Sequence, residues 1–261
     1  MTKRAVVTGA SSGIGEAAVR RFRAAGWEVL AVARRTDRLE ALAAETGAEV
    51  LTVDVTSEAD VERLATRVRE LGGAHVLVNN AGGAFGMASF EASSVDDWRR
   101  MYEVNVIGLK LVTSALLPIL RASVAPSPEV EVVDAATIVN ITSVAAYTPY
   151  ENGSGYNAAK FAARAITGVL RLELSGEPIR VVEVAPGMVQ TEFSLVRFEG
   201  DAARAAAVYE GVHELSADDV AREILHACEL PPHIDLDLIT VKPVAQSAQY
   251  KIHRGPLSAR P

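Results

Sequence analysis

Short runs of valine, isoleucine and leucine alternate along the chain with longer segments in which apolar residues recur every three or four positions. The apolar runs lie at residues 4–10, 27–33, 49–55, 75–81, 137–143, 179–187 and 237–244, with helical periodicity at 15–25, 37–45, 58–70, 94–121 and 155–174. Continuous apolar strands are typical of a parallel sheet that helices cover on both faces. The alternation predicts an α/β fold with a parallel sheet of about seven strands.

Neither an internal repeat nor a low-complexity linker divides the 261 residues, so we predict one doubly wound domain over residues 1–261. Two segments interrupt the regular alternation. Residues 121–136 contain prolines and acidic residues between a predicted helix and strand, which predicts a surface excursion. Residues 191–212 follow a predicted strand and mix aromatic with charged side chains, which predicts a substrate lid.

Composition excludes several functional classes. The net charge is −7 and the basic residues are scattered, so we expect no nucleic-acid surface. The single cysteine, Cys228, lies in a periodic apolar segment and is predicted to be a buried helix residue. The five histidines have no metal-ligand spacing, so we predict no metal site. Because no apolar run approaches ~18 residues, we expect no membrane partner and a soluble cytoplasmic protein.

The segment "VVTGASSGIGEAAVRRF" runs from the first predicted strand into a helix and contains Gly9, Gly13 and Gly15. Glycines allow the backbone to approach a phosphate, and a helix N-terminus supplies unpaired N–H groups and partial positive charge. The spacing TGxxxGxG differs from the GxGxxG dinucleotide fingerprint, and tight packing alone is the alternative. The strand before and the helix after favour phosphate binding.

The second predicted strand, "WEVLAVA", ends at Ala33 and is followed by Arg34 and Arg35. An acid at this position would hold a ribose 2′-hydroxyl, whereas arginine accommodates a 2′-phosphate. The arginine pair therefore predicts NADP(H) as the cofactor. Two solvated arginines that open a turn are the alternative.

The segment "GSGYNAAKFAAR" places Tyr156 and Lys160 four positions apart on a predicted helix. Residues i and i+4 share one helix face, so both side chains can reach one pocket. A nearby ammonium favours the phenolate and lowers the pKa of a tyrosine, which suits it to proton transfer. In isolation, this spacing also fits a solvated lysine beside a half-buried tyrosine.

The chain contains a series of motifs along its length. These motifs are "TGASSGIG", Asp54 with Val55, "NNAG" at 79–82, Asn105, Ser143, the Tyr156 and Lys160 pair, and "PGMVQT" at 186–191. The chain resembles the short-chain dehydrogenase/reductase family from Arg4 to about Pro243, because these are that family's motifs in the family's order. The resemblance implies a Rossmann-type fold and hydride transfer between a nicotinamide cofactor and a carbonyl or secondary alcohol.

The resemblance also implies a role for each candidate catalytic residue. Tyr156 is expected to be the general acid/base, and Lys160 to bind the nicotinamide ribose and to favour the phenolate. Ser143 is expected to hold the substrate oxygen, and Asn105 to anchor a water that links Lys160 to solvent. Taken singly, Ser143 equally fits a cap at a strand end, and Asn105 fits a satisfied amide at a helix crossing.

The residues expected to bind the cofactor surround the predicted carboxyl ends of the strands. Asp54 is expected to meet the adenine amino group, with Val55 beside the ring, although a strand-end aspartate also caps turns. For Asn79 and Gly82, tight packing near the cofactor is the alternative to direct contact. The full set is Gly9, Ser11, Ser12, Gly13, Ile14, Gly15, Arg34, Arg35, Asp54, Val55, Asn79, Ala81, Gly82, Tyr156, Lys160, Pro186, Gly187, Val189 and Thr191.

The C-terminal third, with "TEFSLVRFEGD" and "VKPVAQSAQYKIHR", resembles the branch of NADP-dependent 3-hydroxy acid dehydrogenases that act on serine, allo-threonine and related acids. Arg197 is the candidate partner for a substrate carboxylate. Alternatively, an apolar pocket for a bulkier ketone could be shaped by Tyr147, Tyr150, Met188, Phe193 and Phe198. A cofactor-sensing regulator without turnover is a third possibility. A homotetramer or homodimer is implied by the resemblance.

Overall fold

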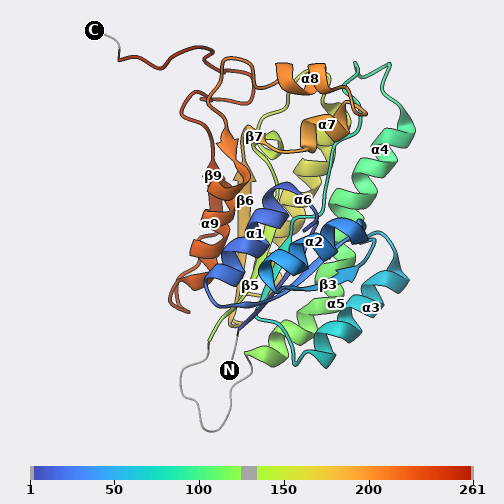
Figure 1. Cartoon of the computed structure of the whole chain (residues 1–261), viewed down its shortest axis with the longest axis vertical. Helices are drawn as coiled ribbons and strands as arrows, with labels where there is room; N and C mark the ends of the chain where they lie inside the picture. The colour runs from blue at the N-terminus through green and yellow to red at the C-terminus, as the bar shows by residue number, and fades with distance from the viewer. Residues whose placement is uncertain (1–2, 125–133, 260–261) are drawn as a thin grey trace.

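The computed structural model describes residues 3–124 and 134–259, so most of the predicted 121–136 excursion lies outside the described residues. Seven parallel strands form one sheet in the order β3-β2-β1-β4-β5-β6-β9, which confirms the predicted α/β fold (Figure 1). The strand order reverses between β1 and β4, where ligands bind in doubly wound folds. The strands are β1 (Arg4–Thr8), β2 (Glu28–Ala33), β3 (Glu49–Thr52), β4 (Val76–Asn79), β5 (Ala136–Ile141), β6 (Ile179–Pro186) and β9 (Leu238–Val241).

Helices cover both faces of the sheet, and each face has its own apolar core. One core joins the strands to α1 (Gly13–Ala24), α2 (Thr36–Thr46) and α9 (Ala217–Glu229). The other joins them to α3 (Glu58–Glu70), α5 (Gly108–Ser123) and the end of α6 (Ser154–Glu173). Because both faces are covered, the central strands are buried throughout, as in β6.

The predicted helix at 94–121 is interrupted rather than continuous. It consists of α4 (Val95–Tyr102), a π-helical turn η1 (Glu103–Ile107) and α5. By length and composition alone, this unit contains a stretch that could cross a membrane, with a mean hydropathy of 1.6, which differs from the sequence expectation. Half of that stretch is buried inside the fold, and the core helix of a soluble protein passes the same test.

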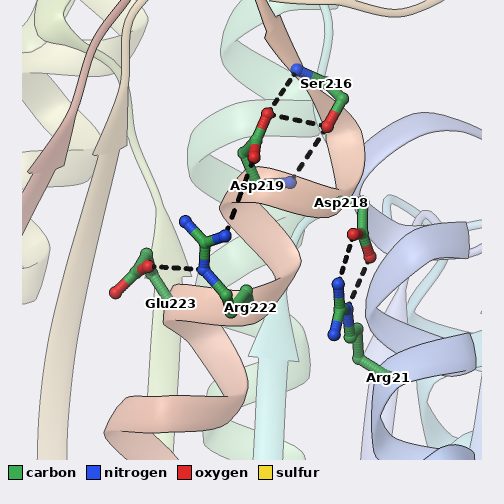
Figure 2. Close-up of polar contacts among 6 residues, drawn as sticks. All are labelled: Arg21, Ser216, Asp218, Asp219, Arg222 and Glu223. Carbon is green, nitrogen blue, oxygen red and sulfur yellow. Dashed lines mark hydrogen bonds and ion pairs between the residues drawn. The ribbon is translucent and has the colours of Figure 1, made fainter.

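The N-terminus of α9 is fixed by reciprocal hydrogen bonds (Figure 2). The Ser216 hydroxyl accepts from the Asp219 backbone N–H at 3.2 Å, and the Asp219 carboxylate accepts from the Ser216 backbone N–H at 2.9 Å. This capping box satisfies donors that a helix start leaves unpaired. Arg21 of α1 pairs with Asp218 and joins the two helices. Cys228 is buried in α9, as predicted.

The predicted lid leaves the sheet beyond β6 and contains α7 (Phe193–Arg197) and α8 (Ala202–Ala207). Both helices lie at the top of the view in Figure 1, above the carboxyl ends of the strands. The two ends of this segment are tied together, because β7 (Val189–Gln190) pairs in parallel with β8 (Leu215–Ser216). The 191–212 segment is therefore a loop whose two ends lie side by side.

Candidate functional site

A cavity of about 1140 Å³ opens at the carboxyl edge of the sheet. Most of the predicted site residues line this cavity. They include residues of the glycine turn at 9–15, here called the phosphate turn because it is predicted to bind phosphate, together with Arg34, Arg35 and Tyr156. Three predicted residues do not line it: Gly15, Asn79 and Asn105. The predicted residues that do are Gly9, Ser11, Ser12, Gly13, Ile14, Arg34, Arg35, Asp54, Val55, Ala81, Gly82, Ser143, Tyr156, Lys160, Pro186, Gly187, Val189 and Thr191.

The glycine turn between β1 and α1 depends on conformations and contacts that side chains would prevent. Gly9 and Gly13 have φ angles of 66° and 57°, which L-residues rarely adopt. A Cβ on Gly15 would lie 2.5 Å from the carbonyl oxygen of Gly9, so this glycine packs the turn against the helix. Ser12, the N-cap of α1, makes no side-chain cap hydrogen bond, so the first turn retains unpaired N–H groups beside the cavity.

Asn80 supports this turn and was not among the predicted residues. Its side-chain amide donates to the carbonyl oxygens of Thr8 at 3.0 Å and Gly9 at 3.2 Å. The Thr8 hydroxyl in turn accepts from the backbone N–H groups of Asn80 and Ala81, both at 3.0 Å. Asn80 therefore ties the end of β4 to the phosphate turn. Its position in "NNAG" was the available signal.

Asn79 differs from the expectation of a cofactor contact, because its side chain enters the core. Its side-chain amide donates to the Thr113 hydroxyl at 2.8 Å and to the side-chain oxygen Oδ1 of Asn140 at 2.9 Å. Asn140 in turn donates to the Thr167 hydroxyl at 3.0 Å. All four side chains are buried. This buried amide network joins β4 and β5 to α5 and α6 and leaves Asn79 no free donor for a ligand.

The two predicted arginines have different surroundings. Arg34 is exposed at the cavity rim. Arg35 turns toward the phosphate turn and donates to the Ser11 hydroxyl at 3.0 Å and the Ser12 hydroxyl at 2.7 Å. It also pairs with Glu192 of the predicted lid at 2.9 Å. Both guanidinium groups thus belong to residues that line the cavity, and that of Arg35 is already hydrogen-bonded to the glycine turn and to Glu192.

Asp54 caps a turn, which was the alternative to a contact with adenine, and the adenine contact stays a prediction. Its carboxylate accepts from the backbone N–H of Thr56 at 3.0 Å and from the Thr56 hydroxyl at 2.8 Å, which caps the turn before α3. Asp54 and Val55 both line the cavity. At the other side, Gln246 accepts from the Met188 backbone N–H at 2.9 Å and holds the strand end that follows Pro186. Gln246 lies in the quoted segment "VKPVAQSAQYKIHR" but was not singled out there.

Ser143, Tyr156 and Lys160 meet at the inner end of the cavity. Ser143 follows β5, where its hydroxyl accepts from the Ala145 backbone N–H at 3.1 Å. Tyr156 and Lys160 lie on α6 and are 8% and 6% exposed. The Lys160 ammonium donates to the Ile141 carbonyl oxygen at 3.0 Å and lies 5.8 Å from the centre of the Tyr156 ring. The predicted triad is therefore assembled around one buried phenol.

The expectation that Lys160 lowers the pKa of Tyr156 does not hold for this geometry. Burial raises the pKa of Tyr156 above its usual value, and the Ser143 hydroxyl and the Arg197 charge only partly oppose it. Burial also lowers the pKa of Lys160 to about 8, although the Glu183 carboxylate opposes the change. Low-dielectric surroundings disfavour the charged form of both groups. At neutral pH, Tyr156 is therefore a protonated acid.

Asn105 lies behind the cavity in the π-helical turn. Its amide donates to the carbonyl oxygens of Met101 at 2.8 Å and Gly83 at 2.9 Å, so a turn of the helix and the loop after β4 are joined. A Cβ on Gly82 would lie 2.6 Å from the Asn105 side-chain oxygen and 3.6 Å from the Lys160 ammonium. Because Gly82 has no side chain, the side chains of Asn105 and Lys160 can both lie close to its backbone. Such π-turns are frequent at functional sites.

Helix α7 covers the buried phenol. The Phe193 ring packs edge-on against the Tyr156 ring, with 5.4 Å between the ring centres. The Arg197 guanidinium lies 5.8 Å from the Tyr156 ring centre and donates to the Tyr150 hydroxyl at 2.9 Å. It also donates to the Gly86 carbonyl oxygen at 3.2 Å and is only 9% exposed. A buried cation therefore lies beside the candidate acid, within the same cavity.

Comparison with known proteins agrees with this geometry. The model of the short chain dehydrogenase family matches residues 3–201. An uncharacterized oxidoreductase of Mycobacterium tuberculosis is 48% identical over 94% of this chain and 92% of its own. Sulfoacetaldehyde reductase of Chromohalobacter salexigens is 39% identical over 95% of this chain and 96% of its own. The closed form of a serine dehydrogenase complexed with NADP⁺ superposes with a TM-score of 0.87 at 34% identity, over 99% of this chain and 100% of the other.

Proposed function

Because the chain belongs to the short-chain dehydrogenase family, an oxidoreductase family that uses NAD(P) and acts on CH–OH groups, we propose that it uses NADP(H) on a small anionic substrate. The proposed reaction interconverts a carbonyl and an alcohol in a molecule that also carries a carboxylate or sulfonate. The observation that carries this proposal is the buried Arg197 guanidinium beside Tyr156. We further propose that the protein is cytoplasmic and that it forms a homo-oligomer. The homo-oligomer is supported by exposed apolar residues on α6, namely Phe161, Val169 and Leu172.

The residues of the cavity fit a dinucleotide. The phosphate turn offers the unpaired N–H groups of α1 to a pyrophosphate. Ala33, at the end of β2, has no carboxylate that would hold a 2′-hydroxyl, whereas Arg34 and Arg35 offer cations to a 2′-phosphate. The serine dehydrogenase of similar structure binds NADP⁺. When bound, the nicotinamide supplies or accepts the hydride.

Tyr156, Ser143 and Lys160 have separate proposed tasks. Tyr156 gives its phenolic proton to the substrate oxygen during reduction and takes it back during oxidation. Its raised pKa keeps this proton in place at neutral pH. Ser143 donates to the same oxygen and fixes its position. Lys160, with a pKa of about 8, is mostly charged at pH 7 and has the proposed task of binding the nicotinamide ribose.

Arg197 has the proposed task of binding the substrate anion. Its contacts with Tyr150 and Gly86 use Nη1 and Nε and leave further N–H donors of its guanidinium. Serine carries a carboxylate and sulfoacetaldehyde a sulfonate, and arginine pairs with the oxygens of either group. Arg197 and Tyr156 line the same cavity, which suits a substrate that carries both an anion and a carbonyl.

The first prediction is that small anionic substrates are preferred over neutral ones. We expect NADP(H)-dependent turnover of sulfoacetaldehyde or of 3-hydroxy acids such as serine, with a higher kcat/KM than for neutral carbonyls of similar size. The assay follows NADPH absorbance across a substrate panel. Turnover confined to bulky neutral ketones would contradict the proposed substrate class and would favour the apolar pocket instead.

The second prediction concerns the cofactor. Wild-type protein should bind NADPH more tightly than NADH, because Arg34 and Arg35 can pair with a 2′-phosphate. The double variant Ala33→Asp, Arg34→Gln should reverse this preference, since it adds a partner for the 2′-hydroxyl and removes a cation. Fluorescence titration with both reduced cofactors measures the ratio of dissociation constants. A wild-type preference for NADH would refute the assignment.

A further inference from the structure

Glu192 is an acidic residue inside a cationic site, and the proposed reaction gives it no task. It is the N-cap residue of α7 and lines the cavity. One carboxylate oxygen lies 2.9 Å from Arg35 Nη1, and the other lies 3.3 Å from Arg38 Nη2. Arg35 and Arg38 come from the start of α2, some 150 residues earlier in the chain. The predicted lid thus reaches back to the arginines that follow β2.

Arg35 has almost no donor left for another anion. Its Nε and Nη2 groups donate to the Ser11 hydroxyl and carbonyl oxygens and to the Ser12 hydroxyl, at 3.0, 3.2 and 2.7 Å. Its Nη1 group donates to Glu192. A guanidinium has five N–H donors, so these contacts use four of them. An incoming phosphate must therefore share Arg35 with Glu192 or replace it.

We propose that Glu192 is a specificity-determining residue that competes with the 2′-phosphate of NADP(H) for Arg35 and Arg38. This inference rests on the proposed cofactor. The carboxylate pairs with both arginines and neutralises part of the positive charge that would favour NADP(H) over NAD(H). Glu192 therefore weakens the binding of NADP(H) and reduces the difference in affinity between NADP(H) and NAD(H).

The size of this effect follows from the exposure of the pairs. The side chains of Glu192, Arg35 and Arg38 are 35%, 42% and 50% exposed. Exposed ion pairs are weak, so breaking each one is expected to change an affinity by roughly two- to fivefold. The hydrogen bond from Arg35 is the main cause that lowers the pKa of Glu192, so the carboxylate is charged at neutral pH and able to compete.

The test uses nucleotide fragments in place of turnover. Adenosine 2′,5′-bisphosphate carries the 2′-phosphate, and adenosine 5′-monophosphate lacks it. We expect Glu192→Gln to bind the bisphosphate roughly three- to tenfold more tightly than wild type by calorimetry, with the monophosphate unchanged. Glu199→Gln is the matched control, because Glu199 belongs to the same segment and does not line the cavity. It should change neither affinity.

Glu192→Asp provides a second variant that retains the charge and withdraws the carboxylate by one methylene. Its affinity for the bisphosphate should lie between those of wild type and Glu192→Gln. Unchanged or weaker bisphosphate binding by Glu192→Gln would overturn the inference, as would equal tightening of the monophosphate. Because neither fragment reacts, these results are independent of whether any carbonyl is reduced. If the protein showed no NADPH-dependent turnover, the proposed function would be contradicted. The affinities for the two nucleotide fragments would still test the role of Glu192.

Discussion

Tyr156→Phe should reduce kcat for carbonyl reduction by roughly 10²- to 10⁴-fold, the usual contribution of a positioned general acid. The substitution removes the phenolic proton and keeps the ring that packs against Phe193. NADPH binding should remain within about twofold of wild type, because the phosphate turn and the arginines are untouched. Stopped-flow measurement of NADPH oxidation, together with a fluorescence titration, separates the two quantities.

Tyr102→Phe is the matched control for this variant. Tyr102 is 48% exposed on α4 and does not line the cavity, so its substitution should leave kcat unchanged. Wild-type rates in Tyr156→Phe would refute the proposed acid. They would favour the alternative in which the buried phenol only packs beneath α7.

Arg197→Met should raise KM for carboxylate or sulfonate substrates by roughly 10- to 100-fold, because hydrogen bonds to charged groups contribute about 1.5–3 kcal/mol. Methionine retains much of the apolar stem of arginine and removes the guanidinium that lies over the Tyr156 ring. For a neutral carbonyl of similar size, kcat/KM should change by less than about threefold. Steady-state kinetics with paired anionic and neutral substrates measures the difference.

Arg204→Met is the control on the same segment, because Arg204 is exposed and does not itself line the cavity, although it stacks on Phe198, which does. It should leave both substrates unaffected. If Arg197→Met impairs anionic and neutral substrates equally, Arg197 only holds α7 through Tyr150 and Gly86. That outcome would contradict the proposal that Arg197 selects substrates by binding their carboxylate or sulfonate.

The sheet was predictable from sequence because burial on both faces leaves long apolar runs, as in the fully buried β6. Three features had no such signal. The strands β7 and β8 have two residues each, too few to show alternation. The π-turn η1 continues the apolar periodicity of its neighbours, so the break at residues 103–107 was not visible. The bulk of the 121–136 excursion lies outside the described residues.

The site was predictable where a motif lies within one turn or strand end, as for Gly9 and Gly13. Contacts between distant segments were not. The pair between Arg35 and Glu192 joins residues 157 positions apart, and neither position indicates the other. The pKa of Tyr156 was predicted in the wrong direction, because its extent of burial depends on how α7 folds back over α6.

The buried amide network around Asn79 makes four positions dependent on one another during evolution. Losing a single member, such as Thr113, leaves an amide donor of Asn79 unpaired in the core and costs about 1–3 kcal/mol. Replacing donors and acceptors together by apolar residues of similar shape is nearly neutral. Positions 79, 113, 140 and 167 should therefore change as a set or not at all. We expect divergent sequences to have either polar residues at all four positions or apolar residues at all four. A mixture of the two would leave a buried donor or acceptor unpaired.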